Sequence, residues 1–166
     1  MYIPIEHLPR NSRVWIYQSD KKLSAVEKDI ISGELRTFTE QWLVHGAALE
    51  ASFALLHDQF VVLAANDSAS GCSIDSSVRV MKELGQKLGI DFLNRTRIAF
   101  SIAGSVVLFP VTALERQFKD GVLKPDTPVF NNAVSTLGEF RDNWPTASKK
   151  TWVSRYFRNE TITNNG

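Results

Sequence analysis

Residues 60–89 read FVVLAANDSASGCSIDSSVRVMKELGQKLG, and this stretch carries the strongest structural signals in the chain. Residues 60–65 are apolar at every position, which predicts a central strand that is covered on both faces. The small polar loop 66–71 then leads into an amphipathic helix that Gly89 is expected to end. The expected core-facing positions of this helix are Ile74, Val78, Met81, Leu84 or Gly85, and Leu88. The stretch therefore predicts a strand, a loop and a helix in direct succession.

The preceding residues predict two strands and another helix. Residues 13–18 are rich in β-branched and aromatic side chains, which are typical of a strand, and residues 51–56 form a hairpin with residues 60–65. Ser24 and Glu27 have the spacing of a capping box. A helical face follows at Ile31, Leu35, Phe38 and Trp42, and the helix is expected to end near Gly46 with His45 in its last turn. Gly33 lies inside this helix and weakens it by about 1 kcal/mol relative to alanine.

The remaining residues predict a second hairpin and several short helices. Alternation at Ile98, Phe100 and Ile102 predicts a strand, which residues 103–105 turn into a partner at 106–109. Thr112 and Glu115 form a second possible capping box, at the start of a short helix. Further helices are expected near residues 134–144 and 152–157.

The resulting order is β-α-β-β-α-β, followed by an extra strand and C-terminal helices. This order predicts an α+β domain of the ferredoxin-like, split βαβ type, with an antiparallel sheet and helices mainly on one face. Several other α+β folds share it. The length of 166 residues and the absence of a composition break predict a single domain over residues 1–158, with a frayed tail at 159–166.

Composition excludes several classes of function. The net charge is +1, so no strong field attracts nucleic acid or anionic lipid. Cys72 is the single cysteine, which rules out an internal disulfide and a four-cysteine zinc site, and the histidines show no metal-ligand spacing. The chain contains no Gly-Lys pair and hence no P-loop. We expect no metal, no cofactor, no nucleic acid partner and no membrane span, and we expect a cytoplasmic protein because no signal sequence is present.

The best candidate position for ligand binding or catalysis is where the polar loop 66–71 enters the following helix. Free backbone amides and the positive end of the helix dipole favour an anion there, and they would stabilise a thiolate. The candidate ligand-binding residues are Ser70, Gly71, Cys72, Ser73 and Asp75, with Trp15 and Tyr17 on one face of the first strand. Helix capping by Ser73 and packing of a small cysteine explain the same residues, and this interpretation is favoured.

A catalytic cysteine would also need a base. The candidate bases for Cys72 are His7, His45 and His57, all remote from it in the sequence. No known cysteine-enzyme spacing surrounds Cys72.

Residues 149–158 carry four basic and three aromatic side chains. Trp152, Arg155 and Tyr156 are therefore candidate partner-binding residues. The favoured alternative is a terminal helix whose aromatic side chains pack on the core while its charges face water.

Four segments, residues 13–19, 70–77, 129–132 and 154–157, resemble a family of short bacterial proteins of unknown activity, many of which carry the label "ABC transporter ATPase". The resemblance implies a bacterial cytosolic protein and supplies no catalytic residues. We therefore expect a non-enzymatic binding or adaptor domain, with an unknown protein or a small anionic ligand held near residues 66–73. The alternatives are a thiol-dependent enzyme that uses Cys72 and, from the label alone, a transporter-associated accessory protein.

Overall fold

The computed structural model describes residues 1–67 and 71–158, and for residues 71–73 it describes the backbone alone. Two compact units divide these residues. Unit 1 comprises Met1–Asn94 and Asn132–Asp142, and unit 2 comprises Arg95–Asn131 and the chain from Asn143 on. The prediction of one domain over residues 1–158 stays a prediction, and the expected frayed tail at 159–166 lies outside the described residues.

Unit 1 is built on a three-stranded antiparallel sheet. Its strands are β1 (Arg13–Gln18), β4 (Ala51–Leu56) and β5 (Phe60–Ala65), in the order β1-β5-β4. All six residues of β5 are fully buried, which confirms the predicted central strand. The chain is thus mixed α and β with antiparallel pairing, as expected.

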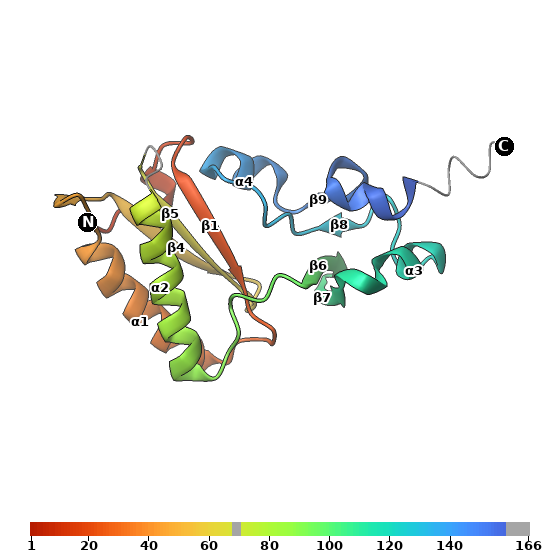
Figure 1. Ribbon diagram of the computed structural model, residues 1–166, viewed down its shortest axis with the longest axis horizontal. Coiled ribbons are helices and arrows are strands. Elements are labelled where there is room, and N and C mark those ends of the chain that lie inside the picture. Colours follow the sequence, from red (N-terminus) through yellow and green to blue (C-terminus); the bar gives the residue numbers. More distant parts are fainter. Residues whose placement is uncertain (68–70, 159–166) are drawn as a thin grey trace. The chain divides into compact units, whose positions relative to one another are not determined.

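Two helices, α1 (Ala25–Gln41) and α2 (Gly71–Leu88), cover one face of this sheet (Figure 1). The predicted capping box is present: the Glu27 amide donates to Ser24 Oγ at 3.1 Å, and the Ser24 amide donates to the Glu27 carboxylate at 2.9 Å. After α1 the chain forms a small hairpin, β2 (Leu43–Val44) and β3 (Ala47–Ala48). His45 lies in the turn of that hairpin with a φ of 52°, so its expected place in the last turn of a helix was wrong.

The core-facing side of α2 also differs from the prediction. Met81 and Leu84 are buried, but Ile74 and Val78 are 39% and 37% exposed. Ser77 is fully buried instead, because its hydroxyl bonds to Tyr17 beneath the helix. The buried face of α2 is therefore rotated by part of a turn from the predicted one, because Ser77 rather than Ile74 or Val78 faces the sheet.

The ferredoxin-like order is not confirmed. β1 and β4 are connected through α1 with β5 between them, but the strand that follows α2 does not join this sheet. Residues 132–137 follow the outer edge of β1 instead. Thr136 forms an antiparallel bridge with Arg13, and the Val14 amide donates to the Ser135 carbonyl at 3.0 Å.

Unit 2 contains its own antiparallel sheet, in the order β7-β6-β8-β9. Its strands are β6 (Arg97–Ile102), β7 (Ser105–Pro110), β8 (Pro128–Val129) and β9 (Thr146–Ala147). The β6–β7 hairpin was predicted. Its helical segments are η2 (Val111–Ala113), α3 (Leu114–Lys119), η3 (Ser148–Lys150) and η4 (Trp152–Tyr156), while η1 (Ile5–His7) belongs to unit 1 and α4 (Leu137–Asn143) spans the boundary.

The second predicted capping box, Thr112 with Glu115, was wrong. Thr112 lies within η2, and α3 begins only at Leu114 without a side-chain cap. The 3-10 turn moves the first α-helical residue past the threonine, so its hydroxyl is out of position for the helix amides.

Candidate functional site

The succession of β5, a loop and α2 is as predicted, but α2 begins at Gly71, so Ser73 lies inside the helix and its expected role as the N-cap was wrong. Asp75 is exposed in the second turn. Ser70 lies outside the described residues, and the side chains of Cys72 and Ser73 are also outside them. The predicted ligand role of these three residues therefore stays a prediction.

Tyr17 has a structural role in unit 1. Its hydroxyl lies 2.7 Å from Ser77 Oγ in a buried contact, and Ser77 Oγ donates to the Ile74 carbonyl at 2.9 Å. Because serine has one hydroxyl proton, the Tyr17 hydroxyl is the donor to Ser77. This bond fixes α2 on β1, and Tyr17 is too buried to line an open site.

Trp15 belongs to an aromatic cluster at the end of the sheet where α2 begins. Its ring centroid lies 5.7 Å from that of Trp42, which lies 4.6 Å from that of Phe38. Trp42 packs against Ala65, the last residue of β5, and is only 3% exposed. Its Nε1–H donates to no acceptor among the residues that the structure describes, which leaves a buried donor unsatisfied at this end of the sheet.

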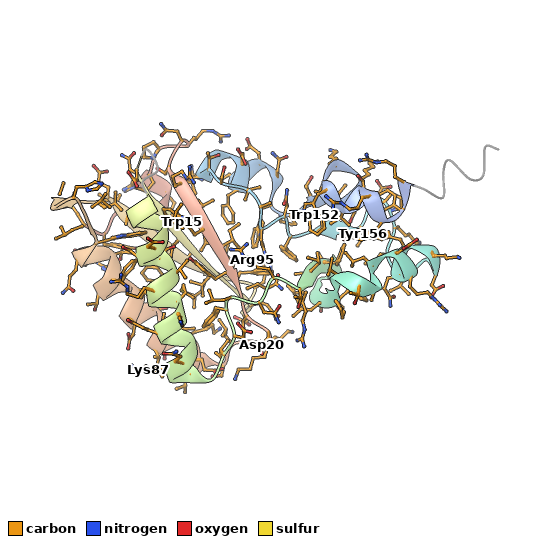
Figure 2. All side chains as sticks on the ribbon, in the orientation of Figure 1. Trp15, Asp20, Lys87, Arg95, Trp152 and Tyr156 are labelled. Atoms are coloured by element: carbon orange, nitrogen blue, oxygen red, sulfur yellow. The ribbon has the colours of Figure 1, made fainter. Side chains whose placement is uncertain are left out.

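A groove of about 440 Å³ runs between α1 and α2. It is lined by Gly33, Glu34, Thr37, Phe38 and Val80. Lys87 of α2 forms an ion pair with Glu34 of α1, so the charge of Lys87 is compensated. Figure 2 shows Lys87 near the C-terminal end of α2 and Trp15 toward its other end, which gives the groove an ionic end and an aromatic end.

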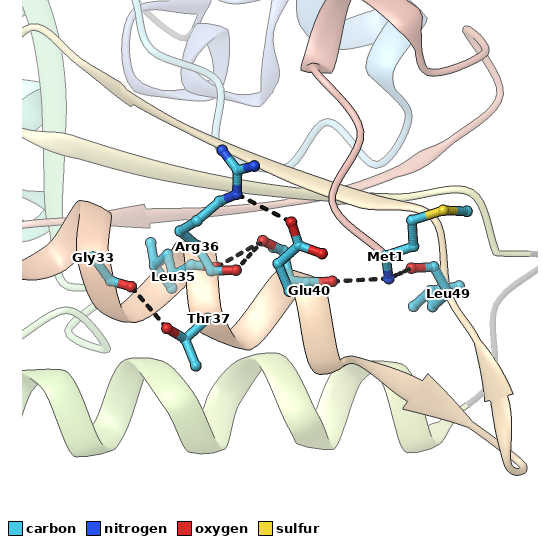
Figure 3. Close-up of polar contacts among 8 residues, drawn as sticks. Met1, Gly33, Leu35, Arg36, Thr37, Glu40 and Leu49 are labelled. Carbon is cyan, nitrogen blue, oxygen red and sulfur yellow. Dashed lines mark hydrogen bonds and ion pairs between the residues drawn. The ribbon is translucent and has the colours of Figure 1, made fainter.

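Gly33 gives the groove its open wall. A Cβ built on this glycine would meet no atom within 4 Å, and its φ does not require glycine. Thr37 donates a hydrogen bond from its hydroxyl to the Gly33 carbonyl at 3.2 Å (Figure 3). The free protein therefore contains no packing reason for a residue that costs about 1 kcal/mol in a helix interior. A glycine inside a helix was the signal in the sequence that could have indicated the groove. The groove and its lining residues Thr37 and Val80 were not predicted.

His57 lies in the β4–β5 turn as predicted, and His7 and His45 are exposed. Because the Cys72 side chain lies outside the described residues, the pairing of Cys72 with a histidine base stays a prediction.

The aromatic side chains of η4 pack on unit 2. Trp152 and Tyr156 are half-buried, with ring centroids 6.1 Å apart, and both pack against the cluster around Phe118. The exposed Arg155 donates from Nε to the Trp152 carbonyl at 3.2 Å, with its guanidinium 5.5 Å from the Trp152 ring centroid. These contacts are those of a terminal segment that packs on a core, although the predicted partner role of the three residues stays untested.

Unit 1 has a second hollow, of about 380 Å³, beside the end of α2. Asp20 and Asp91 contribute carboxylates to it, but Asp91 already accepts from the amides of Leu93 and Asn94 at 2.9 and 3.1 Å. Over residues 1–67 and 74–158, no group of three or more His, Cys, Asp or Glu side chains is arranged to hold a metal ion.

Comparison of the chain with protein-family models, curated proteins and solved structures gives no match. Within the described ranges, every helix is too short or too polar to cross a bilayer. The resemblance to the proteins labelled "ABC transporter ATPase" therefore stays an expectation.

Proposed function

We propose that the protein is a non-enzymatic ligand-binding domain that holds an elongated amphipathic anion between α1 and α2. The observation that carries this proposal is the groove of about 440 Å³ with Gly33 in its wall. Its volume is within the range of small-molecule sites, which are lined mainly by apolar groups with a few polar ones. Phe38 and Val80 supply the apolar surface, and Thr37 supplies the polar contact.

The charge arrangement favours an anionic group at the aromatic end of the groove. The ammonium of Lys87 at the other end is already paired with Glu34. The amides of the first turn of α2 lie at the positive end of the dipole of an 18-residue helix. Val80 lies nine residues after Gly71, which is about 13 Å along the helix axis. A ligand of that length can rest its apolar body on Phe38 and place its charge near these amides.

Dansylated undecanoate is a suitable probe, since it combines a carboxylate, a long apolar chain and a fluorophore. We expect saturable binding at one site per chain, and weaker binding of its uncharged methyl ester. Thr37→Trp places a large side chain in the groove and should abolish binding. Val26→Trp is the matched control, because Val26 is an exposed residue of the same helix, about 16 Å away along the axis.

Three results would overturn the proposal. They are an absence of saturable binding to the wild type, equal affinity for acid and ester, and equal loss of binding in the two tryptophan variants. A different pair of results would assign the groove to an adaptor function. In that case the probe does not bind, whereas a protein partner binds the wild type and fails to bind Thr37→Trp.

A further inference from the structure

Arg13 carries a buried hydrogen-bond donor on the helix-covered face of the unit 1 sheet. It is the first residue of β1 and lies on the same face as Trp15 and Tyr17, because side chains two apart on a strand point to one face. Arg13 is only partly exposed, and its Nε–H is buried with no acceptor among the described residues. A buried donor without a partner is costly, since it has lost its hydrogen bond to water.

Trp42 supplies a second unpaired donor at the same end of the sheet. Arg13 is paired with Ala65 in the β1–β5 register, and the Trp42 ring packs against Ala65 from the helix side. Trp42 is 3% exposed, and its Nε1–H has no acceptor within the described part of the chain. Two buried N–H donors therefore lie beside one residue, Ala65, and no described acceptor serves either of them.

The start of α2 lies near this end of the sheet. The hydrogen bond between Tyr17 and Ser77 fixes one point of α2 on β1. Asp20, which follows β1, lines a hollow with the C-terminal half of α2, so the helix runs in the same direction as the strand (Figure 1). Counting back from the Tyr17–Ser77 bond, Gly71 is about 9 Å away along the helix axis and Arg13 is about 13 Å away along the strand. The positive end of the helix dipole therefore lies near Arg13.

The charge of Arg13 is not compensated by a described acidic side chain. Arg10, Arg36 and Arg116 each form an ion pair with an aspartate or a glutamate. Asp67 follows β5 by two residues and is the acidic residue closest to Arg13 by strand register, but it forms no ion pair with Arg13. Partial burial strengthens the attraction of Arg13 for an anion, because the local dielectric constant is lower than that of water.

We propose that the corner formed by Arg13, the Trp42 indole and the first turn of α2 binds the carboxylate of the ligand. This inference rests on the proposed function and names the groups that hold the charged end of the ligand. All three groups are hydrogen-bond donors, so an anion satisfies them and a cation does not. The guanidinium presents its Nε–H and one Nη–H side by side, which matches the two oxygens of a carboxylate, and the Trp42 N–H donates to one of the same oxygens.

The test compares the binding of dansylated undecanoate with that of its methyl ester. Arg13→Met keeps a long side chain but removes the charge, and it should raise the dissociation constant of the acid at least about tenfold and that of the ester less than about twofold. Trp42→Phe keeps an aromatic ring but removes the donor, and it should weaken binding of the acid at least about threefold. Arg116→Met removes the same charge from an exposed position in unit 2 and should change neither affinity.

Two measurements do not depend on the groove. Acetate should shift the indole ¹H–¹⁵N signal of Trp42 saturably in the wild type and not in Arg13→Met. Without ligand, Arg13→Met should not lower the melting temperature, because it removes an unpaired donor, whereas loss of a structural arginine would lower it.

The outcomes separate this inference from the proposed function. Unchanged affinity of Arg13→Met for the acid, equal losses for acid and ester, or an indole signal that acetate does not move would overturn the inference, even if Thr37→Trp still abolishes probe binding. If the probe does not bind but acetate shifts the Trp42 signal through Arg13, the corner stands and the groove proposal falls. Circular dichroism checks that each variant folds. If Trp42→Phe does not fold, Arg13→Met and the acetate titration decide.

Discussion

Replacing Gly33 by alanine should make the protein more stable and a poorer binder. Gly33 lies in the middle of α1, where alanine is favoured over glycine by about 1 kcal/mol. The added methyl group meets no atom within 4 Å, so no steric cost offsets the gain. For a chain of this size the change corresponds to a rise in melting temperature of about 2–4 °C. The same methyl group narrows the groove, and the dissociation constant of dansylated undecanoate should rise at least about threefold.

Gly85→Ala is the matched control in the other helix of the pair. A Cβ at Gly85 would lie 2.5 Å from the backbone oxygen of Ile90, because the chain turns back at Gly89 and the Ile90 amide donates to the Gly85 carbonyl at 3.0 Å. The clash should cost about 1–3 kcal/mol despite the better helix propensity of alanine. The free energies of unfolding from urea titrations followed by circular dichroism give both values. Loss of stability in Gly33→Ala, or a gain in Gly85→Ala, would refute the packing on which the groove is based.

Three further predictions concern unit 1. Tyr17→Phe should cost about 1 kcal/mol of unfolding free energy by removing the buried donor to Ser77, and a cycle with Ser77→Ala should show coupling, whereas additive losses would contradict the bond. The hydrogen bond from Lys21 lowers the pKa of Glu27 to about 2, so the stability that this carboxylate contributes is present above pH 4.5 and is lost as the pH falls toward 2. Glu27→Gln should lose this part of the acid dependence, and an unchanged acid transition would count against it. Alkylation of Cys72 that requires a pH above about 8 would leave the thiol-enzyme alternative without an activated nucleophile, while rapid alkylation at about pH 6 would favour it.

The parts of the fold that were predictable depend on local signals. Ser24 and Glu27 mark the start of α1 through a capping box that forms within four residues, and the all-apolar β5 indicates a central strand without reference to its neighbours. Strand partners are not local. The alternation at Ile98, Phe100 and Ile102 indicates that β6 is a strand, but it contains nothing that distinguishes pairing with β1 from pairing with β7 and β8.

The groove was not predicted from the sequence, which places a site near residues 66–73, whereas the groove is lined by residues 33, 34, 37, 38 and 80. The succession of β5, a loop and α2 was found from residues 60–89, and the aromatic character of Trp15 was noted. The groove depends on how two helices lie beside each other, which helix periodicity alone does not determine. Periodicity also failed to predict the exposure of Ile74 and Val78. The buried hydrogen bond between Ser77 and Tyr17, rather than the apolar pattern, determines which face of α2 lies on the sheet.

The position of the bound ligand is the most direct test of the proposed function. Amide chemical shifts of the ¹⁵N-labelled full chain, recorded during titration with decanoate, would locate it without a bulky fluorophore. We predict that the largest shifts occur at Gly33, Thr37, Phe38 and Val80, together with the first turn of α2, and that they saturate along one binding curve. Shifts confined to unit 2 or to the hollow beside Asp91, or no saturable shifts at all, would contradict the account.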